Sequence, residues 1–252
     1  MLFLCCTTTL IVACTPNKES SDSTSINKET VESPIHTNTK EHDHLDYDHQ
    51  EKWEAVSGKR QSPINILTNK TEMMGPDTGK ITLNYDKEMS KIENNGHSIQ
   101  VTSGGTSVIN GRHFELKQYH FHAESEHTID GKHYPIEAHF VNMSQSGRLA
   151  VIGVFFKEGV ENKGFQQVLD SLADHSIEPM DHLEEMIPKN YSYYHYLGSL
   201  TTPPLTENVE WYVMKEPVEV SSTQIEEFKK LYSQNNRKVQ PLQDRVVLAY
   251  EE

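Results

Sequence analysis

The stretch Gln118-Tyr119-His120-Phe121-His122 determines how this chain is best interpreted. In a β-strand, residues two positions apart point to the same face. Gln118, His120 and His122 would therefore project side by side from one strand. A pair of imidazoles on one strand face can supply two ligands of a metal site. A chain with 14 histidines can also contain His-x-His by chance.

A second stretch, Ile136-Glu137-Ala138-His139-Phe140-Val141, alternates in the same way. It places Glu137, His139 and Val141 on one face of a strand. The opposite face would carry Ile136, Ala138 and Phe140, which are apolar and suit a core. If the two strands are neighbours, three imidazoles converge, and three nitrogen ligands with one water form an open, catalytic type of zinc site.

The distribution of cysteines limits the ligands that a metal could find. All three cysteines, Cys5, Cys6 and Cys14, lie in the first 14 residues. The rest of the chain therefore has no disulfide and no thiolate ligand, and a metal there must use imidazole or oxygen. Isolated histidines such as His113, His127 and His133 are interpreted as structural or exposed.

Strand patterns dominate the chain downstream of residue 46. We expect strands at 99–101, 113–122, 135–141, 149–156 and 209–213. Two helices are expected, around Phe165–Leu172 and Ile225–Tyr232, the second with Thr223 and Glu226 as a capping box. The connections are too short for repeated crossover helices. The predicted fold is a single α+β, predominantly β domain with a mainly antiparallel sheet and short flanking helices.

The N-terminal segment differs from the rest in composition. Residues 1–14 form an apolar run too short to span a bilayer, which needs about 20 residues, and typical of a signal peptide. Its end, Leu10-Ile11-Val12-Ala13-Cys14, resembles a bacterial lipobox and implies export with a lipid on Cys14, although no Lys or Arg precedes it. The alternative is an apolar N-terminus of a cytosolic protein. Residues 15–43 are polar and are predicted to be a disordered linker, so the folded domain is expected at 44–252.

The charge of the chain and a cluster of histidines bear on partners. The formal net charge is -14, which argues against nucleic acid or anionic membrane surfaces as partners; membrane contact is expected only through Cys14. His36, His42, His44 and His49 form a tract that could collect zinc, or they could be solvated side chains.

The order of several motifs identifies the chain as resembling the alpha-class carbonic anhydrases of the bacterial secreted type. The matching segments span nearly all of residues 47–250 and are Gln61–Asn65 (QSPIN), Asn94–His97 (NNGH), Gln118–His122 (QYHFH), Ser125–Thr128 (SEHT), Glu137–His139 (EAH), Leu149–Val151 (LAV), Gly198–Pro204 (GSLTTPP), Glu210–Trp211 (EW), Lys215–Pro217 (KEP), Gln240–Leu242 (QPL) and Arg245. The resemblance implies a ten-stranded sheet, one zinc ion per chain at the bottom of a cleft, and reversible hydration of carbon dioxide to bicarbonate and a proton. Weak esterase activity is also implied.

The resemblance also assigns roles to residues around the metal. His120, His122 and His139 would be the zinc ligands, and Gln118 and Glu137 would orient two of their imidazoles. Neutral imidazoles leave the ion its full charge, which lowers the pKa of bound water to about 7, so that zinc-bound hydroxide can attack carbon dioxide.

Two further residues match the family's pair that orients the hydroxide. An ionised Glu126 can only accept a hydrogen bond, so the hydroxyl of Thr201 would donate to it. Thr201 could then only accept from the hydroxide, which would aim the nucleophile at the substrate. The neighbouring Thr202 would contact bicarbonate.

The remaining matched residues concern proton transfer and substrate. His97 would be the proton shuttle, because an imidazole accepts and releases protons near neutral pH, and Tyr47 would order water near it. Leu45 stands where the family usually has a tryptophan. The apolar pocket for carbon dioxide would consist of Val141, Val151, Leu200 and Trp211, with Gln100 on the opposite, hydrophilic wall.

Two alternatives to an enzyme remain open at this point. The first is a catalytically silent binding protein on the same fold, although such relatives usually lack a ligand histidine. The second is a zinc-capture lipoprotein that uses the tract between His36 and His49. The oligomeric state is not predicted.

Overall fold

The structure is a computed structural model, and it describes residues 45–53, 58–75 and 79–252. These ranges belong to one compact unit, Glu41–Glu252. The predicted signal segment with Cys14, the polar linker, and three histidines of the tract, His36, His42 and His44, lie outside the described residues. No helix in the described ranges has both the length and the apolar content that a membrane span requires.

Twelve strands, two α-helices and three short 3-10 helices are found in the described residues. In chain order they are η1 Gln50–Lys52, β1 Asn65–Ile66, η2 Thr68–Lys70, β2 Glu72–Met73, β3 Ile81–Asn94, β4 Ile99–Ile109, β5 Arg112–His122, β6 Thr128–Ile129, β7 Ile136–Met143, β8 Leu149–Glu158, α1 Lys163–Asp174, η3 Leu183–Met186, β9 Tyr193–Ser199, β10 Glu207–Met214, β11 Val218–Val220, α2 Ser222–Leu231 and β12 Leu248–Tyr250. The five strands and two helices expected from the sequence correspond to β4, β5, β7, β8, β10, α1 and α2, although the expected ranges of β7 and α2 extend one residue beyond the observed ones, at Pro135 and Tyr232.

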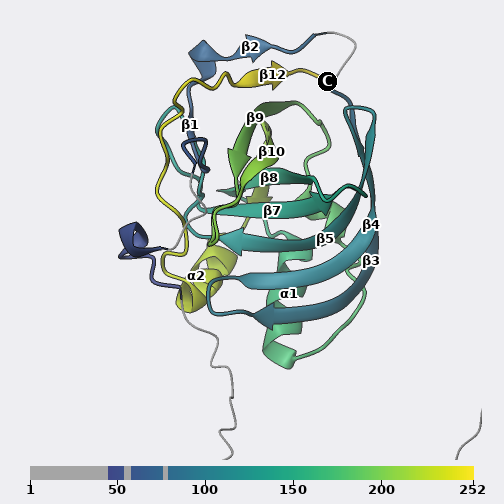
Figure 1. The fold of residues 1–252 in the computed structure, drawn as a ribbon. Coiled ribbons are helices and arrows are strands. Elements are labelled where there is room, and N and C mark those ends of the chain that lie inside the picture. Colours follow the sequence, from purple (N-terminus) through teal and green to yellow (C-terminus); the bar gives the residue numbers. More distant parts are fainter. Residues whose placement is uncertain (1–44, 54–57, 76–78) are drawn as a thin grey trace, which may run out of the picture. The chain divides into compact units, whose positions relative to one another are not determined.

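A ten-stranded sheet forms the centre of the fold (Figure 1). Its order is β2-β12-β9-β10-β8-β7-β5-β4-β3, and β11 pairs with β8 outside this path. Of the nine pairings in the described part of this sheet, six are antiparallel and three are parallel. The prediction of a mainly antiparallel ten-stranded sheet is confirmed.

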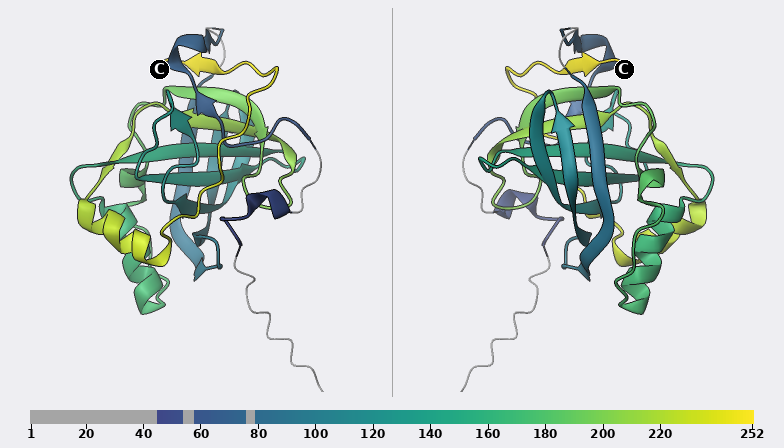
Figure 2. Two further views of the ribbon diagram at one scale, coloured as in Figure 1. Left: turned by 90° about the vertical axis from the view of Figure 1, so that its left-hand side faces the viewer. Right: turned by 90° about the vertical axis from the view of Figure 1, so that its right-hand side faces the viewer.

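One face of the central strands packs against the helices. Phe121 on β5 contacts Phe165 of α1 and Phe228 of α2, with ring centroids 5.0 and 6.3 Å apart. Figure 2 shows α1 and α2 close together beside the sheet, and Phe165 also contacts Phe228. Full burial of such a side chain contributes about 1.5–3 kcal/mol. The residues thereby committed to this core are Tyr119 and Phe121 of β5 and Ile136, Ala138 and Phe140 of β7.

The N-terminus of α2 differs from the prediction. The capping box consists of Ser221 and Gln224 rather than Thr223 and Glu226, so the helix begins two residues earlier. Gln224 is buried and also bonds the backbone of Asn162, the residue that caps α1. The earlier start therefore satisfies the ends of two helices with one side chain.

A buried carboxylate links β10, the start of β5 and the residue before β8. Glu210 on β10 has a side chain that is only 3% exposed, and it accepts hydrogen bonds from Arg112, Arg148 and Tyr212. Burial would raise the pKa of Glu210, but the hydrogen bonds from Arg112, Tyr212 and Arg148 outweigh it and hold the pKa at about 2. The group therefore stays ionised in the folded protein to strongly acidic pH.

We predict that Glu210→Gln lowers the free energy of unfolding near neutral pH by about 1–3 kcal/mol, because both arginines lose their carboxylate. A lowered folded-state pKa stabilises the protein above the unfolded value, and this stabilisation is lost as pH falls. The difference between the two proteins should therefore shrink between the ordinary pKa of 4.5 and about 2. Urea unfolding across this window measures it.

A suitable control is Glu115→Gln on β5, since Glu115 is exposed and pairs with the exposed Lys117. That variant should unfold nearly as the parent does. Equal stability of the Glu210 and Glu115 variants, or a loss that does not change with pH, would contradict the prediction.

Candidate metal centre

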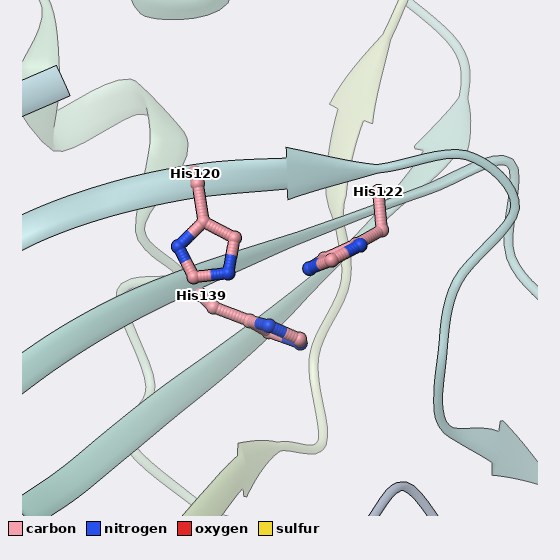
Figure 3. A group of neighbouring side chains, drawn as sticks. All are labelled: His120, His122 and His139. Atoms are coloured by element: carbon pink, nitrogen blue, oxygen red, sulfur yellow. The ribbon is translucent and has the colours of Figure 1, made fainter. Parts of the chain in front are cut away.

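Three imidazoles meet on the face of the sheet opposite the helices. The β5–β7 register places His120 directly opposite His139, and His122 lies two residues further along β5. Candidate ligand atoms of the three rings all lie within 4.8 Å of one another, and Figure 3 shows the rings pointing toward a common region. His122 and His139 are fully buried, and His120 is partly exposed.

The outward-facing nitrogen of each ring lies close to an oxygen atom. His120 Nδ1 lies 2.8 Å from Gln118 Oε1, and His122 Nδ1 donates to the backbone carbonyl of Asn235 at 2.7 Å. His139 Nε2 lies 3.0 Å from Glu137 Oε1. Because each outer nitrogen faces an acceptor, the proton is held there and the inner nitrogen keeps its lone pair for a metal.

A metal fits this group. Within the ranges that the structure describes, His122 Nε2 is buried and has no hydrogen-bond partner, an arrangement that would be unfavourable without a ligand. Three imidazoles without thiolates or carboxylates are the ligand set of a catalytic zinc site. His120, His122 and His139 would hold the ion.

Burial favours the neutral form of two of the three ligands, His120 and His122. Burial, together with the charges of His122, His139 and His97, holds the pKa of His120 well below its ordinary value. Burial is also the main cause that lowers the pKa of His122, although the Glu126 carboxylate opposes it. Neutral imidazoles are the form that binds metal, and they would leave the ion its positive charge.

Glu137 lies beside the ligand His139 and is held there by a hydrogen-bond network. Its Oε2 accepts from the backbone N–H groups of Glu126 and His127, and its Oε1 lies 2.8 Å from His127 Nδ1. Although burial raises the pKa of Glu137, the charges and hydrogen bonds of His127 and His139 outweigh it and hold the pKa well below its usual range. An ionised Glu137 is thereby fixed beside His139.

The network continues away from the metal group. His127 Nε2 lies 2.7 Å from the Tyr196 hydroxyl, which donates to Ser62 Oγ. His127, Glu137 and His139 could also be grouped as a metal site, but Glu137 is already committed to hydrogen bonds. Gly153 leaves room for the carboxylate, since a Cβ there would lie 3.0 Å from Glu137 Oε1.

The turn that carries Leu200, Thr201 and Thr202 is anchored at its first residue. Ser199 Oγ accepts from Ser62 N, Ser199 N donates to Ser62 Oγ, and the Trp211 indole donates to Ser199 O. These hydrogen bonds join the Gln61–Asn65 segment to the Gly198–Pro204 segment, so both segments contribute to the position of the turn. Thr201 is buried, with 4% exposure.

The predicted hydrogen bond from Thr201 to Glu126 is not formed in the described structure. Glu126 Oε1 accepts from the backbone N–H of Arg237 at 2.7 Å, and Oε2 is buried without a hydrogen-bond partner. Glu126 Oε2 lies 3.9 Å from His139 Nδ1. The carboxylate is thus next to the metal group, with one acceptor oxygen still available.

Sheet register separates an apolar from a polar side of the site. Val141, Val151 and Trp211 are paired in sequence across β7, β8 and β10, and Leu200 packs in the same apolar cluster. On the other side, Gln100 of β4 is paired with His120. The imidazoles therefore lie between the predicted apolar wall and the predicted hydrophilic wall.

His97 and Tyr47 lie near this group. His97 lies in a turn in which Asn95 Oδ1 accepts from the backbone N–H groups of His97 and Ser98. The charge of His97 is among the causes that lower the pKa of His120. The Tyr47 hydroxyl is buried without a hydrogen-bond partner in the described residues. Burial and then the charge of Glu126 raise the pKa of Tyr47, and Trp53 packs edge-on against its ring at 5.2 Å.

Sequence reasoning missed three parts of the site: the Asn235 carbonyl behind His122, the Arg237 amide on Glu126, and the network through His127. Asn235 is 113 residues from His122 and contributes a backbone atom, so no residue pattern could identify it. His127 was interpreted as structural or exposed, and it is completely buried. The close spacing of Glu126, His127 and Glu137 is the only local signal.

A large mixed sheet that carries three converging histidines is typical of mononuclear zinc enzymes with an all-imidazole site. Residues 45–251 match the sequence profile described as eukaryotic-type carbonic anhydrase. A carbonic anhydrase from Neisseria gonorrhoeae is 38% identical over 227 residues, which cover 82% of this chain and 88% of that protein. The chain belongs to the eukaryotic-type (alpha-class) carbonic anhydrase family.

Solved structures agree with this membership. The alpha-carbonic anhydrase of Thermovibrio ammonificans in complex with sulfanilamide superposes with a TM-score of 0.71 at 44% identity, covering 76% of this chain and 87% of that chain. A hyperthermostable carbonic anhydrase from a hydrothermal vent chimney gives 0.68 at 45% identity, covering 77% and 89%. The chain is therefore a zinc enzyme that hydrates carbon dioxide, the general activity of the family, with one zinc ion. The roles of individual residues stay predictions.

We predict that His122→Ala reduces zinc affinity by more than about 100-fold, because loss of a ligand should exceed the 10–100-fold effect of losing an outer partner. Zinc content after dialysis should fall from one ion per chain to nearly none, and carbon dioxide hydration should fall with it. His113→Ala is the control, since His113 is an exposed histidine on the same strand. If His122→Ala kept several weakly bound zinc ions, the histidine tract rather than this site would be the main zinc ligand.

Proposed function

We propose that the chain interconverts carbon dioxide and bicarbonate by using its apolar wall to hold the substrate and His97 to export the proton. The observation that carries the proposal is the convergence of three imidazoles whose outer nitrogens each face an oxygen atom. When present, the zinc ion lowers the pKa of a coordinated water to about 7, which makes a nucleophile available near neutral pH.

The apolar wall suits an uncharged substrate. Val141, Val151 and Trp211 are almost fully buried, and they lie beside the imidazoles on the β8 and β10 side. A dry surface of this kind gives carbon dioxide a place from which bound water is excluded. Leu200 would close this wall, and Thr202 would contact the product.

Glu126 and Thr201 would orient the reacting group. Glu126 Oε2 has no partner among the described residues and is available to accept the Thr201 proton. With its proton committed, Thr201 Oγ1 can only accept, so it favours a neighbour that carries a hydrogen. This selects the orientation in which a lone pair faces the substrate.

His97 would carry the proton away. It follows a turn at the end of the hairpin between β3 and β4, next to the polar Gln100 side of the site. Its imidazole can accept and release a proton near neutral pH. Tyr47, whose hydroxyl has no protein partner in the described residues, would hold water between the site and this turn.

We predict that His97→Ala lowers kcat by about 10-fold or more, since a positioned acid–base group contributes about 10²–10⁴-fold. kcat/KM should remain near that of the parent, because binding and conversion of carbon dioxide do not use His97. Stopped-flow hydration at low and high buffer concentration measures both, and added imidazole should restore kcat. A parallel loss of kcat and kcat/KM would contradict the shuttle role.

The hydration assay also distinguishes an enzyme from the alternative of a catalytically silent binding protein. The parent protein should hydrate carbon dioxide, and sulfanilamide should suppress this activity. A parent that holds one zinc ion and shows no hydration would indicate the binding protein instead.

We further propose that the enzyme is exported and anchored to a membrane through a lipid on Cys14. The support lies in the sequence: an apolar run ends at Leu10–Cys14, and polar residues 15–43 separate it from the domain. A tether of this composition would let the domain stand off the membrane surface. The enzyme would then act on the outer side of the cytoplasmic membrane, or in the periplasm or at the outer membrane.

We expect Cys14→Ser to abolish incorporation of a tagged fatty acid in a bacterial host and to move the protein from the membrane fraction to the soluble fraction. Cys6→Ser is the matched control, because Cys6 lies in the same apolar run outside the lipobox. Equal labelling of the Cys14 variant and the parent would refute the lipid anchor.

A further inference from the structure

Asn235 lies between α2 and the C-terminal segment and is 1% exposed. Its polar atoms are used almost completely. The backbone N–H donates to Ala123 O at 3.1 Å, and the side-chain Oδ1 accepts from Ala123 N at 2.8 Å. The backbone carbonyl accepts from the His122 ring, as described above. Asn235 is therefore bound tightly to the end of β5.

The side-chain amide makes a second connection. Asn235 Nδ2 donates to Phe121 O at 3.0 Å and to His97 O at 2.9 Å. Phe121 lies between the two ligand histidines of β5, whereas His97 belongs to the turn that joins β3 to β4. One amide nitrogen thus bridges the metal-binding strand and the turn that carries the proposed shuttle.

The geometry points to Asn235 as a positioning residue: its side-chain amide ties the His97 turn to the metal-binding strand and so sets where His97 stands relative to the metal group. This inference rests on the proposed role of His97. The two connections of Asn235 are separable, because the carbonyl behind His122 is backbone and the donor to His97 is side chain. A side-chain substitution can release the turn and leave the ligand's partner in place.

The expected consequence is selective for proton transfer. Transfer between a donor and an acceptor depends steeply on their separation, and a misplacement of about 1 Å can cost about 10²-fold. A loosened turn would place His97 correctly for only part of the time. The interconversion of carbon dioxide and bicarbonate uses the opposite, apolar side and should be affected little.

Two variants test the connection. Asn235→Asp keeps the acceptor for Ala123 N but replaces the donor with an oxygen that faces two carbonyls. Asn235→Ala removes both side-chain connections, and it provides a second test if the buried charge of the Asp variant prevents folding. Asn236→Ala is the matched control, because the neighbouring Asn236 has a buried Oδ1 without a hydrogen-bond partner in the described residues.

The first readout does not involve activity. Hydrogen exchange of the zinc-free protein reports on the turn at residues 94–98, and we expect exchange there to rise by about 10-fold or more in both Asn235 variants. Zinc affinity, measured by competition with a chelator, should stay within about 3-fold of the parent because the carbonyl partner of His122 remains. Asn236→Ala should match the parent in both measurements.

The second readout is the split between kinetic parameters. In both Asn235 variants kcat should fall by about 10-fold, kcat/KM should stay within about 2-fold, and added imidazole should restore kcat. In a His97→Ala background, Asn235→Ala should lower kcat no further, since the two residues act in one step.

Unchanged exchange at residues 94–98, or a fall of kcat and kcat/KM together with zinc affinity, would overturn the inference. The outcomes also distinguish it from the proposed function. If exchange rises in the Asn235 variants but His97→Ala leaves kcat unchanged, the tether stands and the shuttle role fails. If His97→Ala slows kcat but exchange does not change, the shuttle stands and the tether fails.

Discussion

The pairing of His120 with His139 across β5 and β7 is the constraint on which the site depends. A slip of one residue would turn His139 and Glu137 toward the helices and bring Ala138 and Phe140 into the site. The opposite face prevents this slip. Tyr119 and Phe140 pack with ring centroids 5.2 Å apart, and Phe121 contacts residues of both helices. The burial that stabilises the sheet is thus the same interaction that holds three imidazoles together.

A second constraint is which ring nitrogen of each ligand histidine carries the proton. Glu137 is completely buried, and an unpaired charge there would be strongly unfavourable. Two backbone N–H groups and the His127 ring stabilise the carboxylate, and the ionised group then faces His139 Nε2. Gln118 and the Asn235 carbonyl act in the same way on the other two rings. The fold therefore sets the tautomers of the ligand histidines by contacts that involve no metal. The imidazoles then need little rearrangement when the ion binds.

Much of this arrangement follows from local alternation. The two-residue period of strands predicted that the three histidines share their strand faces with Gln118 and Glu137, and it predicted the core face of β7. The roles of Gln118 and Glu137 as outer partners came from the family resemblance. What alternation cannot predict is contact between distant segments, such as the Asn235 carbonyl behind His122 or the reciprocal bonds of Ser62 and Ser199. The capping box shows another limit. Ser221–Gln224 and Thr223–Glu226 both have suitable residue types and spacing, and only the contact of Gln224 with Asn162 in the folded chain selects the first.

The strand order places an apolar surface on one side of the three histidines and a polar surface on the other. Moving across the sheet from β10 through β8, β7 and β5 to β4, the site-facing side chains change from apolar to imidazole to amide. In the proposed mechanism an uncharged substrate approaches from the first side, and a proton leaves past the last. The two steps then do not compete for the same surface. The side-chain hydrogen bonds of Asn235 go to Phe121, Ala123 and His97, so a change in this side chain should alter the departure of the proton without altering the apolar wall.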